Sequence, residues 1–151
     1  MNASASRPPT RDWAVSVLVV WQGRVLLHAH RKLGIWLPPG GHVERDELPD
    51  EAAVREVLEE AGVACELLGD VAISAPGPTQ MVRPRGVQLE AISPGHEHID
   101  LVYLARPAEP YTGDIAGEEP GFGWYDLRSA LALGLTPEME AWVRLALTEV
   151  D

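Results

Sequence analysis

The segment from Pro49 to Gly62 is the feature that most limits how this chain folds. Its apolar side chains recur at the spacing of one helical face, and this stripe consists of Val54, Val57, Leu58 and Ala61. Pro49 suits the first position of a helix, and Gly62 suits the position just past its end. The sequence therefore predicts an amphipathic helix over residues 49–61, with its apolar stripe turned toward a core.

A second set of side chains gathers on another face of the same helix. Glu56, Glu59 and Glu60 are spaced three and four residues apart, so their carboxylates converge. Like charges on one face destabilise a helix, and a hard divalent cation with oxygen ligands is the simplest compensation. A Glu-rich face alone is more often solvated surface. Here, however, the glutamates occur with Arg55 and Glu47 at fixed spacings, which favours a metal site.

The order of these residues resembles a known motif. The pattern Gly41-x5-Glu47-x7-Arg55-Glu56-Val57-x-Glu59-Glu60-x-Gly62-Val63 is similar to the Nudix box of MutT-like proteins, and every defining position is present in residues 41–63. The resemblance implies an α/β/α sandwich with a mixed β-sheet. It also implies a Mg²⁺- or Mn²⁺-dependent hydrolase that cleaves the pyrophosphate linkage of nucleoside diphosphate derivatives by water attack at phosphorus. ADP-ribose-like compounds, nucleotide sugars and nucleoside triphosphates are the expected substrates.

The resemblance also implies roles for individual residues. Glu56, Glu59 and Glu60 are the expected metal ligands, and the carbonyl of Gly41 is a further candidate because no Cβ blocks close approach. Arg55 is expected to take part in catalysis by orienting the glutamates, and Glu47 to support it. The box departs from its usual form at Asp46, where glycine is common, and at Leu48, which has no oxygen to cap the helix.

The general base is expected outside the box. Glu118 stands six residues before Trp124 in an acidic loop, and MutT-type members show a similar Glu-to-Trp spacing. Glu118 is therefore the first candidate and Glu119 the neighbouring alternative. Because most loop glutamates are simply solvated, this assignment depends on a kinetic test.

Three further side chains are candidates for substrate binding. Arg83 and Arg85, in a proline-rich loop, suit bidentate phosphate contacts, and Trp36 suits stacking on a base, although buried packing is its commoner role. His96, His98 and Asp100 alternate, so they would share one face of a strand. Alternation of this kind usually marks a polar surface, and these three are not counted among the metal ligands.

The rest of the chain predicts a single domain over residues 13–151, after a flexible tail at residues 1–12. Residues 13–30 are expected to form a hairpin, residues 34–41 a loop, and residues 99–105 a central strand apolar on both faces from Leu101. Further strands are expected over residues 64–74 and over residues 87–92. Asp126 and Thr136 are expected to cap the last two helices, and the final helix presents the stripe Met139, Trp142, Val143 and Ala146.

Composition limits the partners. The formal net charge of −11 argues against binding a nucleic-acid polymer, since that affinity depends on phosphate neutralisation. No apolar run reaches membrane-spanning length, and no membrane partner is expected. The lone Cys65 excludes an internal disulfide and agrees with a cytoplasmic location. Isopentenyl diphosphate isomerases, a third alternative, need a catalytic cysteine. Cys65 follows the box in an expected strand, which argues against that function. The expected partner is a small nucleoside diphosphate derivative, with a possible homodimer.

One alternative function keeps the fold but not the reaction. A nucleotide-sensing Nudix domain would bind its ligand without cleaving it. The intact set of Glu56, Glu59 and Glu60 argues against a loss of catalysis. A comparison of ligand binding with product formation would separate the two functions.

Overall fold

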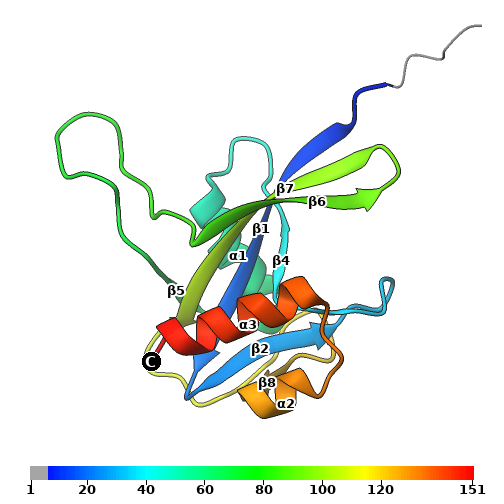
Figure 1. Cartoon of the computed structure of the whole chain (residues 1–151). Helices are drawn as coiled ribbons and strands as arrows, with labels where there is room; N and C mark the ends of the chain where they lie inside the picture. Colours follow the sequence, from blue (N-terminus) through cyan, green and yellow to red (C-terminus); the bar gives the residue numbers. More distant parts are fainter. Residues whose placement is uncertain (1–6) are drawn as a thin grey trace, which may run out of the picture.

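The computed structural model describes residues 7–151, and within them one mixed sheet of eight strands organises the molecule (Figure 1). Five strands follow the order β3-β2-β1-β7-β5, while β4 pairs with β1, β6 with β7 and β8 with β2. The elements are β1 (Thr10–Trp21), β2 (Arg24–Ala29), β3 (Trp36–Leu37), β4 (Gly40–His42), α1 (Pro49–Ala61), β5 (Cys65–Leu68), β6 (Gly86–Ser93), β7 (His96–Pro107), β8 (Gly123–Tyr125), α2 (Leu127–Leu131) and α3 (Pro137–Glu149).

The centre of the sheet is the parallel pair β1 and β7. Their register runs from Thr10 opposite His96 to Val19 opposite Ala105, and β7 also pairs with β5 and β6. The predicted central strand and the predicted hairpin of β1 and β2 are therefore confirmed. The predicted tail is too long, because residues 10–12 pair with β7 as part of β1. Its residues 1–6 lie outside the described part of the chain.

The two faces of the sheet are covered by different helices (Figure 1). α1 packs over the face that carries Val15, Val17 and Tyr103, whereas α3 packs over the face that carries Leu18 and Val102. Alternate residues of one strand thus supply two separate apolar layers. The predicted α/β/α sandwich with a mixed sheet is confirmed. Among the described residues, no helix combines the length and apolarity needed to cross a membrane.

α1 has the predicted bounds, but its buried stripe is rotated relative to the prediction. The side chains of Ala52 and Ala53 are fully buried together with Val57, whereas Leu58 is 52% exposed and Val54 only partly buried. The small alanines let the helix lie close to the sheet, and Leu58 falls at the edge of that contact. Because of this rotation, the glutamates flank the core instead of lying opposite it.

The ends of the helices follow the predicted local chemistry. Leu48 makes no side-chain cap for α1, Asp46 adopts a left-handed backbone at φ 66°, and Gly62 ends the helix at φ 69°. Asp126 and Thr136 cap α2 and α3 by accepting backbone N–H groups. Two strand predictions need correction. The expected loop at residues 34–41 contains the short strand β3 and the start of β4. The strand expected over residues 64–74 covers only Cys65–Leu68.

Candidate active site

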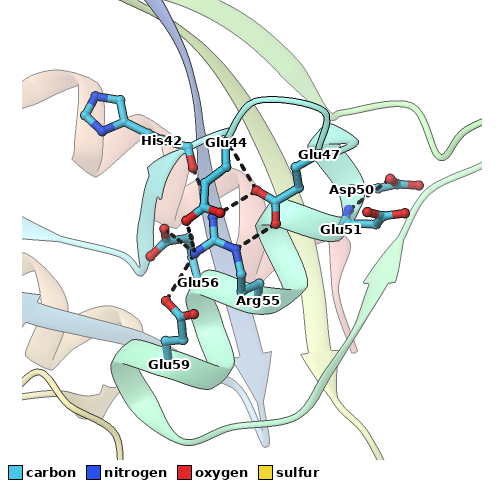
Figure 2. A network of polar contacts seen from close by, with 8 residues as sticks. All are labelled: His42, Glu44, Glu47, Asp50, Glu51, Arg55, Glu56 and Glu59. Carbon is cyan, nitrogen blue, oxygen red and sulfur yellow. Dashed lines mark hydrogen bonds and ion pairs between the residues drawn. The ribbon is translucent and has the colours of Figure 1, made fainter.

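Arg55 stands at the centre of a group of carboxylates between α1 and the loop after β4 (Figure 2). Its Nε and Nη2 atoms donate to the two oxygens of Glu47 at 2.7 and 2.9 Å, a bidentate pair. Nη1 donates to Glu56 at 2.9 Å and to Glu59 at 3.1 Å. Nη2 also donates to the carbonyl of His42 at 3.1 Å. One guanidinium therefore orients three carboxylates and the end of β4.

These contacts and the burial of the side chains shift the pKa values of Arg55 and of the carboxylates beside it. Hydrogen bonds from Arg55 hold the pKa of Glu47 below its ordinary value, and the same bonds, led by those to Glu47, raise the pKa of Arg55. Burial raises the pKa of Glu56, although Arg55 opposes this shift. One positive charge is thus shared among several acidic groups, and the set keeps an excess of negative charge.

Glu60 completes the group on the side facing β4. The backbone N–H of Gly40 donates to its Oε2 atom at 3.3 Å. Burial, reinforced by the negative charge of Glu56, raises the pKa of Glu60 to about 8. A Cβ on Gly41 would come within 2.6 Å of Glu56 Oε1, so a larger residue at this position would displace the Glu56 carboxylate. We call Glu47, Glu56, Glu59 and Glu60 the carboxylate cluster.

The donor set of the carboxylate cluster fits a hard divalent cation. Every candidate ligand atom is an oxygen, from a carboxylate or from the backbone beside a glycine, which is the chemistry that Mg²⁺ and Mn²⁺ prefer. A cation there would neutralise the carboxylates that Arg55 leaves uncompensated. It would also oppose the burial and the repulsion from Glu56 that together raise the pKa of Glu60.

The loop before β8 docks on the C-terminal end of α1. The N–H groups of Glu118 and Glu119 donate to the carbonyls of Glu59 and Glu60 at 2.8 and 3.0 Å. The negative charge of Glu119 also helps to raise the pKa of Glu60. Gly117 is needed at this junction because an added Cβ would meet the carbonyl of Glu60. The backbones of Glu118 and Glu119 are thus fixed beside the carboxylate cluster.

A cavity of about 410 Å³ adjoins the cluster on the α3 face of the sheet, with Gly40 in its wall. Trp142 Nε1 donates to Gln88 Oε1 at 3.0 Å, and Gln88 Nε2 donates to Glu138 Oε1 at 2.7 Å. Ser16 Oγ donates to Asp100 Oδ2 at 2.9 Å. An aromatic ring and several hydrogen-bonding groups therefore converge in a space of the size that small ligands occupy. A cavity of about 570 Å³ lies elsewhere, beside Trp13 and Glu47 at the other end of the cluster.

Sequence reasoning missed most of this cavity. Gln88, Glu138 and Trp142 come from β6 and α3, and no local pattern connects them. Asp100 was expected on a polar surface, but it is only 2% exposed. Burial, together with a hydrogen bond to Glu90, raises the pKa of Asp100 to about 8. The sequence signal for Asp100 is its alternation with His96 and His98, which places the three side chains on the same side of the sheet.

The three predicted substrate contacts lie away from the carboxylate cluster. Arg83 forms a bidentate pair with Asp70, and Arg85 forms one with Glu149, each with a shortest contact of 2.7 Å. Both arginines line a different cavity from the one that Gly40 borders. Trp36 packs edge-on against Tyr125 with ring centroids 5.5 Å apart. These positions give the three residues structural partners, and their contact with substrate stays a prediction.

Cys65 lies in β5 and is partly buried. Burial raises the pKa of its thiol to about 12, so the thiol stays protonated at neutral pH.

Comparison with known proteins agrees with this geometry. The family model described as the NUDIX domain matches residues 10–146. A solved NUDIX-family hydrolase from Clostridium perfringens is 34% identical, with a TM-score of 0.81, and the match covers 94% of this chain and 99% of that one. A "MutT-like protein" of Streptomyces ambofaciens is 39% identical over 42% of each chain.

A further relative is the mouse diphosphoinositol polyphosphate phosphohydrolase 3-alpha, 51% identical over 28% of this chain and 26% of its own length. The matched parts thus span less than half the length of these curated relatives. The family match, by contrast, spans nearly all of the described sheet and helices. The chain belongs to the Nudix hydrolase family, whose members cleave pyrophosphate-type linkages.

Proposed function

We propose that this protein is a Mg²⁺- or Mn²⁺-dependent pyrophosphohydrolase that acts on nucleoside diphosphate derivatives by water attack at phosphorus. The observation that carries the proposal is the carboxylate cluster, in which three glutamates pair with Arg55 and a fourth, Glu60, lies beside Glu56. A divalent ion bound there would neutralise the charge of the phosphates and lower the pKa of a bound water. We assign Glu56, Glu59, Glu60 and the carbonyl of Gly41 as its ligands.

The remaining steps belong to the side chains of the protein. Arg55 holds Glu56 and Glu59 in position, while Glu47 holds Arg55 through its bidentate pair. The attacking water has to lose a proton, and we propose that a carboxylate of the docked loop accepts it. Glu118 is the candidate from the sequence. Glu119 has support from its electrostatic contact with Glu60.

The cavity beside Gly40 is the best candidate for the part of the substrate that is not cleaved. Trp142 offers an aromatic surface, and Gln88 and Asp100 offer hydrogen-bonding groups that suit the edge of a nucleobase. ADP-ribose-like compounds, nucleotide sugars and nucleoside triphosphates all carry such a base, joined through ribose to the pyrophosphate. The mouse relative is named for a diphosphoinositol polyphosphate, so a compound of this class should be assayed beside the nucleotides.

A panel of pyrophosphate compounds tests this proposal. Each of these compounds would be incubated with the protein and either Mg²⁺ or Mn²⁺, and products separated by chromatography. We expect cleavage of at least one nucleoside diphosphate derivative, dependent on the metal and absent with Glu60→Gln. Glu66→Gln is the matched control, because Glu66 is an exposed glutamate of β5 that pairs with Arg106. Absence of cleavage throughout the panel would contradict the proposal.

The nucleotide-sensing alternative makes a different prediction in the same experiment. A sensing domain would bind one member of the panel, as measured by calorimetry, and return it unchanged after prolonged incubation with metal. Glu56 and Glu59 pair with Arg55, and Glu60 lies beside Glu56, so all three box glutamates are present together. This favours the enzyme, because a domain that only binds has no need for this charge-costly arrangement.

Location and assembly are proposed from the sequence. We propose a cytoplasmic protein whose single domain includes β1 from Thr10 onward, with a homodimer as its possible assembly. The exposed apolar side chains of Trp13, Val87 and Leu89 are the surface to test. Light scattering after size-exclusion chromatography would give the mass. A monomer at all concentrations would contradict the dimer.

A further inference from the structure

A second group of potential metal ligands lies on the sheet, at the outer end of β1. Asp12, His42 and His98 each offer one ligand atom, and these atoms all lie within 4.8 Å of one another. We call these three residues the histidine cluster. Asp12 and His98 are direct cross-strand partners of β1 and β7, and His42 of β4 pairs with Ala14 of β1. Three strands therefore present these side chains on one face.

The spacing of the ligand atoms is close to that of a tetrahedral metal site. The Nε2 atoms of His42 and His98 are 3.1 Å apart, and His42 Nε2 lies 3.6 Å from Asp12 Oδ2. Bonds of about 2.0–2.1 Å around a tetrahedral Zn²⁺ place neighbouring ligand atoms about 3.3 Å apart. Small side-chain rotations would bring the cluster to this geometry.

A fourth residue holds the aspartate in place. His96 Nε2 lies 3.3 Å from Asp12 Oδ2, and its Nδ1 lies 2.8 Å from the hydroxyl of Thr10. Such partners behind a ligand fix its orientation and raise metal affinity. Asp12 is thus tied to β7 through His96.

We propose that the histidine cluster binds one Zn²⁺ or a similar transition-metal ion through His42 Nε2, His98 Nε2 and the Asp12 carboxylate, with solvent completing the coordination. Nitrogen donors distinguish this site from the carboxylate cluster, whose donors are all oxygens. The side chains of His42 and Asp12 are 60% and 53% exposed, so an ion can reach the site from solvent. The bound ion would join β1, β4 and β7.

The test is a calorimetric titration with Zn²⁺ in the presence of saturating Mg²⁺, which occupies oxygen-rich sites. We expect one Zn²⁺ per wild-type chain. His98→Gln should weaken the affinity by at least about 10–100-fold, since even residues behind a ligand contribute that much. His30→Gln is the matched control, because His30 lies just after β2, outside the histidine cluster, and accepts the N–H of Leu33.

Two further variants keep the result interpretable. Asp12→Asn preserves the size of an exposed side chain and should also weaken Zn²⁺ binding, even if His98→Gln disturbs the fold as judged by circular dichroism. Glu60→Gln should retain the Zn²⁺ site, so failure of the proposed hydrolase would not be mistaken for failure of this site. No binding of Zn²⁺ by the wild type, or equal affinity in the wild type, His98→Gln and Asp12→Asn, would overturn the proposal.

Discussion

The carboxylate cluster and the histidine cluster meet at β4 but are built in different ways. In β4, Gly41 lies against Glu56, whereas the side chain of the next residue, His42, joins the histidine cluster. The carbonyl of His42 still accepts a hydrogen bond from Arg55. The carboxylate cluster comes from residues 47–60, within one loop and one helix. The histidine cluster instead combines β1, β4 and β7, and His42 and His98 are 56 positions apart in the sequence.

The two clusters also differ in charge and exposure. The carboxylate cluster is partly buried and carries more negative charge than Arg55 can balance, so a bound cation should stabilise it. The histidine cluster is more exposed, and its imidazoles satisfy one another by a hydrogen bond. The first cluster should therefore depend strongly on its ion. The second should bind an ion with little effect on the fold.

The largest expected effect concerns the loop that docks on the carboxylate cluster. Glu118→Gln and Glu119→Gln should be assayed separately, and the variant that removes the general base should lower kcat by about 10²–10⁴-fold with little change in KM. The histidine cluster should keep its metal affinity in both variants. Wild-type kcat in both would move the proton-accepting role into the helix, to Glu56.

Arg55→Gln measures how strongly the free energy of unfolding depends on the carboxylate cluster, because Arg55 pairs with that cluster. Loss of the guanidinium leaves Glu47, Glu56 and Glu59 without their shared partner, which should lower the free energy of unfolding by on the order of 3 kcal/mol. Urea denaturation measures this change. Arg106→Gln is the control, because the exposed pair of Arg106 with Glu66 should contribute no more than about 1 kcal/mol. Similar losses in the two variants would show that Arg55 is an ordinary surface arginine.

Addition of Mg²⁺ should stabilise the protein through the carboxylate cluster alone. An ion that binds only the folded state at about 100 times its dissociation constant adds about 2.7 kcal/mol. The melting temperature of the wild type and of His98→Gln should therefore rise on adding Mg²⁺, whereas that of Glu60→Gln should rise much less. If all three proteins rose equally, the stabilising ion would be bound elsewhere.

The smallest expected effect concerns the start of α1. Leu48 has the extended backbone of a capping residue but no side-chain hydrogen bond, so Leu48→Ser should stabilise the protein by up to about 1 kcal/mol. Thr136→Ala is the counterpart in α3, where an existing cap is lost, and it should destabilise by about 1 kcal/mol. Unchanged urea midpoints in both variants would show that these caps contribute little here.

The difference between a cluster built from neighbouring residues and one built from distant strands also explains which features the sequence predicts. The bounds of α1, its stop at Gly62 and the caps at Asp126 and Thr136 depend on neighbouring residues, and the structure agrees with them. The glutamates around Arg55 were predictable for the same reason. Apolar runs likewise identified the hairpin and the central strand β7.

Features that depend on packing between distant strands were not predictable. The rotation of α1 that exposes Leu58 depends on how closely Ala52 and Ala53 approach the sheet. The cavity beside Gly40 and the histidine cluster depend on strand register, which periodicity within one segment does not determine. Asp12 therefore fell into a predicted tail although it pairs with His98.

The most direct test of the central claim is the kcat of Glu59→Gln and Glu60→Gln on the best substrate of the panel, at saturating Mg²⁺ or Mn²⁺. Both substitutions preserve size, and Glu60→Gln resembles the protonated form that burial already favours, so the fold should persist. We predict that kcat falls by more than about 100-fold in each variant, while Glu66→Gln stays at the wild-type value. Near-wild-type kcat in both Glu59→Gln and Glu60→Gln would contradict the assignment of the carboxylate cluster as the catalytic metal site.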